Sequence, residues 1–192
     1  MSRLIFVTHP EVTIDPAMPV ERWRLSDIGI RRMRAFATSG VADRVSAVWA
    51  SSEAKAIEAA GILAAGLGIG VAIDAGLGEN DRSATGFLPP PEFEATADRF
   101  FATPEESVRG WERAVDAQAR IRTAVTRIVA GHGTGDVAIV AHGAVGTLML
   151  CDLKGWQISR AADQPFQGHY WTCALPDLTE GSGWAPIASR AG

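Results

Sequence analysis

The chain has 192 residues, of which 47% are hydrophobic, and its formal net charge is −4. This size and composition suit a single globular domain over residues 1–192 with a full hydrophobic core. The 18 lysines and arginines form no dense block, which argues against a nucleic-acid partner or a polybasic membrane surface. No apolar run approaches the roughly 20 residues of a membrane span, and the first residues lack a signal-peptide core. We therefore expect a soluble, cytoplasmic protein.

Cys151 and Cys173 are the two cysteines of the chain, and neither belongs to a CxxC pattern. The sequence thus indicates no thiolate metal cluster and leaves a disulfide between them open. It contains no internal repeat and no linker, and it carries no signal for an oligomeric state.

The first third of the chain alternates strand and helix patterns. The run LIFV at 4–7 is continuously apolar, as in a strand buried on both faces, and 45–50 and 71–73 are weaker strand candidates. One helix is predicted from a Ser26 cap to Gly40. A second is predicted to begin at Ser51 or Ser52 and to end near Gly66 or Gly68.

The middle of the chain is predicted as a long loop followed by a long helix. The stretch from Gly76 to Pro104 is proline-rich and is interpreted as an irregular excursion over one end of the sheet. Thr103, Pro104 and Glu106 then resemble a capping box, and apolar residues recur at helical spacing up to Gly131.

The last third begins with a second continuously apolar run, VAIVA at 137–141. A short helix is predicted after His142, and a last strand is possible at 170–175. Because strands and helices alternate, the sequence favours an α/β fold with a largely parallel central sheet covered on both faces.

Each of the two apolar strands runs directly into a histidine, His9 after the first and His142 after the second. Ligands of open α/β sheets collect at the carboxyl ends of the strands, so both imidazoles are expected at one edge of the sheet. A single histidine in such a place is more often a packing residue than a catalyst. Two at equivalent positions favour a functional site.

Two further pieces are expected at the same edge. A strand ends at Ser51-Ser52 and a helix opens directly after it, so free backbone N–H groups would form an anion site there. Lys55 falls in the first turn, where a cation opposes the helix dipole unless it meets an anion. Glu79 follows the candidate strand at 71–73, and taken alone it is better interpreted as an exposed loop carboxylate.

Together these residues resemble the histidine phosphatase superfamily, the phosphoglycerate-mutase-like group. THPE stands where the family has Arg-His-Gly-Glu, SSEAKAIEAA resembles SSxxxRAxxTA, LGE resembles LxE, and VAIVAHGAVGTLML resembles the strand–HG–helix unit. The ordered set spans roughly residues 3–155. The resemblance implies a three-layer α/β/α fold, a small phosphorylated or anionic partner, and no metal or other cofactor.

The resemblance also implies roles for individual residues in a two-step phosphoryl transfer. His9 would be the nucleophile and form a phosphohistidine, Glu79 the general acid and base, and His142 a ligand of the transferring group. The phosphate-binding residues would be Thr8, Ser52, Lys55, Arg82 and Gly143. The activity expected is that of a phosphatase, with a mutase as the lesser alternative.

Three positions of the phosphate pocket depart from the family. Thr8 and Lys55 stand in place of arginines, and Pro10 stands in place of a glycine. Each lost charged hydrogen bond costs about 1.5–3 kcal/mol. Arg82, three residues after Glu79, is the preferred replacement cation, ahead of the other candidates Arg22 and Arg24.

Two other classes of function stay open at this point. The lost arginines are compatible with a non-catalytic module that binds a phosphorylated or anionic ligand. His9, His142 and Glu79 would also be a legitimate zinc set for a hydrolase, although Lys55 would repel a metal. A dinucleotide-binding fold is weaker still, because no GxGxxG follows the first strand.

Overall fold

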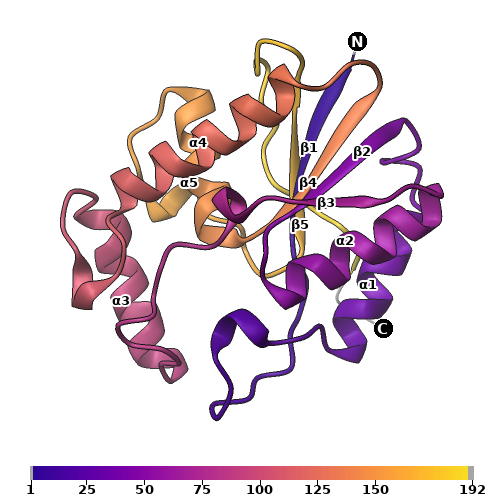
Figure 1. The fold of residues 1–192 in the computed structure, drawn as a ribbon. Coiled ribbons are helices and arrows are strands. Elements are labelled where there is room, and N and C mark those ends of the chain that lie inside the picture. Colours follow the sequence, from indigo (N-terminus) through magenta and orange to yellow (C-terminus); the bar gives the residue numbers. More distant parts are fainter. Residues whose placement is uncertain (1, 190–192) are drawn as a thin grey trace.

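The computed structural model describes residues 2–189, which form one mixed sheet between two layers of helices (Figure 1). The strand order is β3-β2-β4-β1-β5-β6. The first four of these strands are mutually parallel, and β5 and β6 are antiparallel to their neighbours. The strands are β1 (Arg3–Thr8), β2 (Val45–Ala50), β3 (Val71–Ile73), β4 (Asp136–Ala141), β5 (His169–Ala174) and β6 (Ala185–Pro186).

Alternate side chains of the central strand β1 point to opposite faces of the sheet and pack into two separate hydrophobic cores. Leu4 and Phe6 of β1 pack with the helices α3, α4 and α5, whereas Ile5 and Val7 pack with α1 and α2. Figure 1 shows these two helical layers on opposite sides of the sheet. The period of two along β1 therefore confirms the predicted α/β/α architecture. The helices are α1 (Asp27–Ala37), α2 (Ala54–Leu67), α3 (Pro90–Ala102), α4 (Ala114–Ala130) and α5 (Gly143–Lys154).

The start of α1, the end of α2 and the start of α5 follow the predicted local signals. The Ser26 side chain accepts a hydrogen bond from Gly29 N and caps α1, and Gly68 ends α2 in the left-handed conformation with φ 68°. The N-cap of α2 is Glu53 rather than Ser51 or Ser52. Helix α5 begins directly after His142, as expected.

The predicted helix from Thr103 to Gly131 is wrong in its first third. Thr103 instead ends α3, and the chain becomes helical again only at α4. The interruption has a backbone cause, because Arg109 and Gly110 have φ values of 54° and 83°. A Cβ on Gly110 would also lie 2.7 Å from the Cβ of Ala84. The apolar residues Val108 and Trp111 of this segment are buried, although the segment is not part of a long helix.

The stretch from Gly76 to Pro104 was expected to be irregular, but α3 occupies its second half. Pro90 and Pro91 lie at the first two positions of that helix. A missing backbone N–H costs nothing there, since no intrahelical acceptor exists for it. The prolines therefore begin a helix at this point instead of excluding one.

Two open questions from the sequence are answered by the fold. Cys151 and Cys173 are both free and buried, so they form no disulfide. Within residues 2–189, no helix combines the length and apolar character that crossing a membrane requires.

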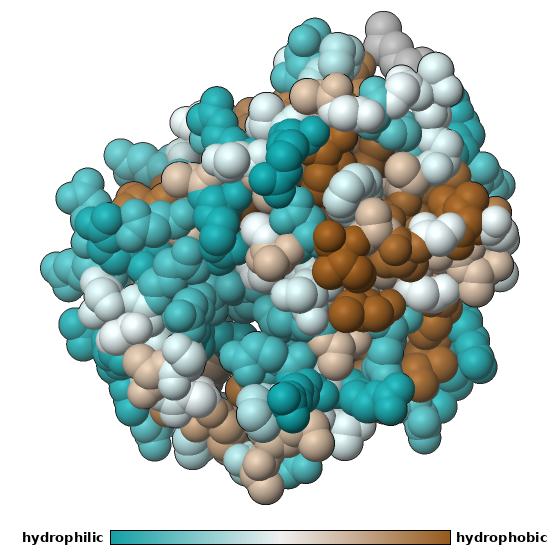
Figure 2. All heavy atoms as spheres, viewed as in Figure 1, coloured by the Kyte–Doolittle hydropathy of each residue, from teal (hydrophilic) through white to brown (hydrophobic). Residues whose placement is uncertain are grey.

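The two helical layers differ in surface character. Figure 2 shows mainly hydrophilic side chains on the side of α3 and α4, whereas apolar side chains gather on the side of α2 and β3. Ile57 of α2 and Ile73 of β3 are 40% and 47% exposed.

Candidate active site

The adjacent parallel strands β1 and β4 bring the two strand-end histidines together. Thr8 pairs with Ala141 in the strand register, and His9 N donates to Ala141 O at 3.0 Å. The next residue of each strand is a histidine, and the two ring centroids lie 5.2 Å apart with an interplanar angle of 70°. The carboxyl edge of the sheet thus holds a pair of imidazoles in contact.

His9 presents one ring nitrogen and uses the other within its own loop. Its Nδ1 lies 2.8 Å from the carbonyl oxygen of Pro10. A carbonyl only accepts, so Nδ1 carries the proton and the lone pair is on Nε2. Burial, with the charge of Lys55 acting in the same direction, lowers the pKa of His9 from 6.5 to about 4. The ring is therefore neutral and nucleophilic at ordinary pH, and 9% of the residue is exposed.

His142 has the opposite arrangement of its two nitrogens. Nε2 lies 2.7 Å from Ser51 Oγ and 3.2 Å from Glu53 Oε1. Nδ1 is buried and has no hydrogen-bond partner among residues 2–189. Burial holds the pKa of His142 well below its usual value, although the Glu53 carboxylate opposes this shift. An anion bound beside Nδ1 would favour protonation of the ring, and it would then accept a hydrogen bond from Nδ1–H.

Glu53 connects these groups, and it was not predicted from the sequence. Its carboxylate accepts from Lys55 Nζ at 2.5 Å and from Glu79 N at 2.9 Å. Despite burial, the charges of His142 and Lys55 lower the pKa of Glu53 to about 2. Its only sequence signal is its place directly after Ser51-Ser52, at the carboxyl end of β2.

Lys55 lies inside the site but is already paired. Besides Glu53, its Nζ donates to Val20 O at 2.9 Å, and the residue is only 3% exposed. Counted from Ser51, the arginine of the SSxxxRAxxTA pattern falls on Ala56, which is fully buried in the core. Lys55 thus places a cation one position before the arginine of the SSxxxRAxxTA pattern, and the Glu53 carboxylate balances its charge.

Glu79 lies at the N-terminus of α5, the helix that follows His142. Its two carboxylate oxygens accept from Ala144 N at 3.2 Å and from Val145 N at 3.1 Å. Burial raises the pKa of Glu79, while the charge of Arg82 partly opposes the shift. A carboxyl with a raised pKa keeps its proton toward neutral pH, which is what a general acid requires.

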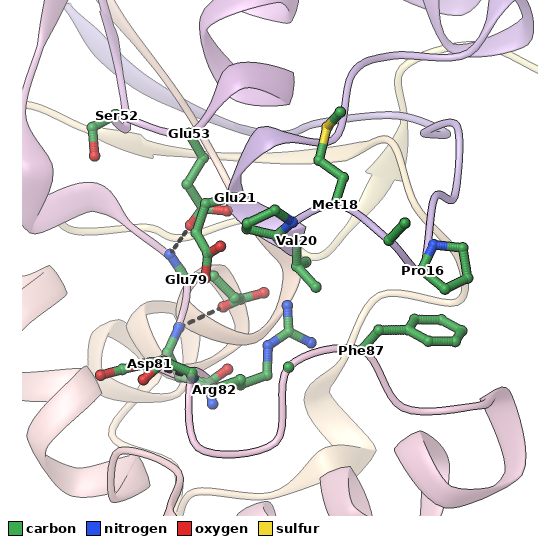
Figure 3. A pocket seen from close by; sticks show the side chains of 15 residues that line it. Pro16, Met18, Val20, Glu21, Ser52, Glu53, Glu79, Asp81, Arg82 and Phe87 are labelled. Atoms are coloured by element: carbon green, nitrogen blue, oxygen red, sulfur yellow. Dashed lines mark hydrogen bonds between the residues drawn. The ribbon is translucent and has the colours of Figure 1, made fainter.

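A pocket of about 560 Å³ opens beside Glu79. Figure 3 shows Arg82 extending into it, between acidic residues on one side and apolar residues on the other. The Arg82 guanidinium also lies 5.2 Å from the Phe93 ring and 5.6 Å from the Trp111 ring. Neither Arg22 nor Arg24 lines this pocket, and Arg24 pairs with Glu58. Of the three arginines predicted as replacement cations, Arg82 is the one in the site.

The remaining predicted phosphate ligands divide into two groups. Ser52 lines the pocket, and Gly143 begins α5 beside the histidines. Thr8, in contrast, is fully buried, and its hydroxyl donates to Gln164 Oε1 at 2.6 Å and accepts from His169 N at 2.9 Å. The expectation that Thr8 binds phosphate therefore disagrees with its geometry, because its hydrogen bonds are used within the fold.

Gln164 is a second residue that the sequence did not identify. It covers Gly143 closely, since a Cβ there would lie 2.6 Å from Gln164 Nε2. It comes from the loop before β5, so nothing in the local pattern points to it.

The metal-hydrolase alternative finds no ligand set in the part of the chain that the structure describes. Within residues 2–189, no three histidine, cysteine, aspartate or glutamate side chains are spaced to hold a metal ion.

Solved structures resemble this fold over nearly its whole length. Mycobacterial glucosyl-3-phosphoglycerate phosphatase in complex with VO3 is 20% identical, with a TM-score of 0.81 over 98% of this chain and 100% of that chain. Its complex with inorganic phosphate gives 20% identity and a TM-score of 0.79 over 99% of each chain.

Two further structures are similar in the same way. Bacillus stearothermophilus YhfR is 20% identical, with a TM-score of 0.76 over 95% of each chain. Phosphoserine phosphatase from Entamoeba histolytica, in complex with 3-phosphoglyceric acid, is 14% identical, with a TM-score of 0.74 over 95% of each chain. At these identities the likeness establishes the fold.

Sequence comparison provides the family. Among curated proteins none matches this chain. The family model described as histidine phosphatase superfamily (branch 1) matches residues 18–178, which is most of the chain. The chain therefore belongs to the histidine phosphatase superfamily.

Proposed function

We propose that the protein is a phosphomonoesterase that works through a phosphohistidine at His9. The observation that carries this proposal is the pairing of the two imidazoles. His9 offers the lone pair of Nε2 because its Nδ1–H is held by Pro10 O, and His142 offers a buried Nδ1 without a partner beside it. One ring is prepared for attack and the other for binding the group attacked.

In the first step His9 Nε2 attacks phosphorus, the P–N bond forms and the ester P–O bond breaks. Glu79 gives its proton to the leaving alcohol oxygen. In the second step Glu79 takes a proton from water as the water oxygen attacks phosphorus. The P–N bond then breaks, inorganic phosphate leaves, and His9 returns to its neutral form.

His142, Lys55 and Arg82 supply positive charge to the phosphoryl oxygens in this proposal. His142 would take up a proton as the dianion binds, with Nδ1–H donating to phosphate and Nε2–H to Glu53 and Ser51. Lys55 remains paired with Glu53, so Arg82 is the cation in the pocket that can approach the phosphoryl group fully. Free N–H groups at the start of α2, beside Ser52, add to the same field.

The test is to trap the phosphoenzyme. The wild-type protein and His9→Asn are mixed with a ³²P-labelled aryl phosphate and quenched in alkali, where phosphohistidine is stable. We expect acid-labile label on the wild type, none on His9→Asn, and a loss of turnover of about 10⁴-fold or more in the variant. His132→Asn, in the loop between α4 and β4 at the far edge of the sheet, is the matched control and retains both label and turnover.

A non-catalytic phosphate-binding module is the second candidate, and the pairing of Lys55 with Glu53 favours it because this pairing weakens the positive field. That function predicts thermal stabilisation by phosphate or vanadate together with no turnover and no trapped label across a panel of phosphomonoesters. The same result would overturn the phosphomonoesterase proposal.

A further inference from the structure

The pocket beside Glu79 has one basic residue and several acidic ones. Its lining includes Arg82 as the basic residue, and the carboxylates of Glu21, Glu53, Glu79 and Asp81. Glu53 is balanced by Lys55. Glu21 and Asp81 are exposed, and Ser83, by hydrogen bonding to Asp81, lowers the pKa of that carboxyl and keeps it charged.

This charge distribution affects any second anionic group of a substrate. Once Arg82 pairs with the phosphoryl group, no other lysine or arginine among the described residues lines the pocket to meet a carboxylate or a second phosphate. Such a group would instead face Glu21 and Asp81 at the rim. Like charges in proximity cost binding free energy, so the pocket selects against anionic leaving groups.

The opposite wall of the pocket is apolar. Pro16, Met18, Val20 and Phe87 line it, and Figure 3 shows them together, across from the acidic residues. Met18 is 41% exposed, so its side chain is accessible to a ligand in the pocket.

The apolar wall is held in shape before any ligand arrives. Trp23 is 9% exposed, and its ring packs 5.8 Å from the Phe87 ring. The indole Nε1 donates to Asp15 O at 2.9 Å and to Met18 O at 3.2 Å, which fixes the loop after β1. The wall is therefore a preformed surface of the kind that apolar ligand groups bind.

We infer that the substrate is a phosphomonoester of an apolar alcohol without negative charge, whose alkyl or aryl part lies against Met18 and Phe87. The inference rests on the proposed function, since it concerns the leaving group at the same site. The Entamoeba histolytica phosphoserine phosphatase, in contrast, was solved with 3-phosphoglyceric acid, a ligand that carries a carboxylate besides its phosphate.

The experiment compares hexyl phosphate with the same ester bearing a terminal carboxylate. We expect kcat/KM for hexyl phosphate to be higher by about tenfold or more, as hydrophobic contact and charge repulsion act together. In Met18→Ser, kcat/KM for hexyl phosphate falls about three- to tenfold relative to the carboxylated ester. In the double variant Glu21→Gln/Asp81→Asn, the carboxylated ester gains relative to hexyl phosphate. Glu106→Gln, an exposed carboxylate outside the pocket, leaves the ratio unchanged.

The outcomes distinguish this inference from the function on which it rests. Turnover with equal or better use of the carboxylated ester overturns the inference and leaves the phosphomonoesterase proposal standing. Absence of turnover and of trapped label overturns the function, and calorimetric binding of the two esters then decides the inference. Tighter binding of hexyl phosphate supports it, and equal or weaker binding overturns it.

Discussion

The ends of β1 and β4 lie side by side, and a histidine follows each of them. The two histidines differ in their hydrogen-bond partners. His9 is locked by the carbonyl of the next residue in its own loop, at Pro10, and keeps a small exposed fraction. His142 is locked from other parts of the chain, by Ser51 and Glu53 at the end of β2, and is fully buried. As a result, among residues 2–189, Nε2 of the first ring and Nδ1 of the second have no hydrogen-bond partner.

Under the proposed function, this difference lets one residue type take two roles at one edge of the sheet. A ring whose proton is held by a neutral carbonyl is a neutral nucleophile, and its depressed pKa keeps it so. A ring whose nitrogen faces a carboxylate can become a cation when an anion arrives, because Glu53 stabilises the charged form. The roles follow from the hydrogen-bond partners of the two rings.

After His9→Asn, the largest effect is expected from Glu79→Gln, at the start of the helix that follows β4. Glutamine keeps one side-chain oxygen that can accept from the N–H groups at the start of α5, whereas its NH2 group cannot accept, and it has no acidic proton to give to the leaving oxygen. Under the proposed mechanism, kcat for an alkyl phosphate falls about 10²- to 10⁴-fold. The loss is smaller for an aryl phosphate with a good leaving group. Equal losses for both esters would indicate that Glu79 only caps α5.

The pH profile of the same variant gives a second test. Glu79 acts as an acid only while protonated, so wild-type turnover of an alkyl phosphate should fall as pH rises through its raised pKa. On the acid side, turnover should fall as His9 takes up a proton near pH 4, its pKa in the free protein. The Glu79→Gln variant should lose the alkaline fall and keep the acid one. An unchanged profile would remove Glu79 from the proton transfer.

An intermediate effect is expected from Glu53→Gln, which removes the charged partner of His142. Losing a charge-assisted hydrogen bond costs about 1.5–3 kcal/mol, or roughly a ten- to hundredfold decrease in kcat/KM. The variant also leaves the buried Lys55 ammonium without its carboxylate, so the free energy of unfolding should fall by about 3–5 kcal/mol. Denaturant unfolding and steady-state kinetics measure the two effects separately.

The stability effect of Glu53 should depend on pH in a defined direction. Its folded-state pKa of about 2 lies below the ordinary value of 4.5. The stabilisation is therefore fully present above pH 4.5 and is lost as pH falls toward 2, so the wild type and Glu53→Gln should converge in acid. Asp136→Asn is the control, because this fully buried carboxylate pairs with Arg3 at the opposite edge of the sheet. It should lose stability and keep kcat/KM.

Much of the fold was predictable because its signals are local. Continuous apolar runs predicted β1 and β4, and a serine cap and a left-handed glycine marked helix ends. The failure at Thr103 has a physical reason, since Val108 and Trp111 are buried at helical spacing in a segment that the backbone of Arg109 breaks. Proline was interpreted only as a helix breaker, whereas at the first positions of α3 it is favourable.

From the local pattern alone, the candidate site was predictable where a residue follows a strand directly, whereas Glu79 was expected from the family resemblance and Arg82 from its spacing to Glu79. His9 and His142 were identified in this way, because parallel strands bring their carboxyl ends to one edge. Glu53 and Gln164 were missed because their partners are distant in sequence: Glu53 contacts His142, and Gln164 contacts Thr8. Thr8 was assigned to phosphate from a motif position, and the pairing of β1 with β5 uses its hydroxyl instead.

The smallest effect on catalysis is expected from Thr8→Val, at the β1 end. The substitution keeps the shape of the side chain but removes the acceptor of His169 N, which is buried. An unsatisfied buried N–H costs about 1–3 kcal/mol of unfolding free energy. We expect that loss in denaturant unfolding, recovery in Thr8→Ser, and a change of only a few-fold in kcat/KM, since His9 is held by Pro10. A hundredfold loss of kcat/KM at unchanged stability would instead return Thr8 to the phosphate site.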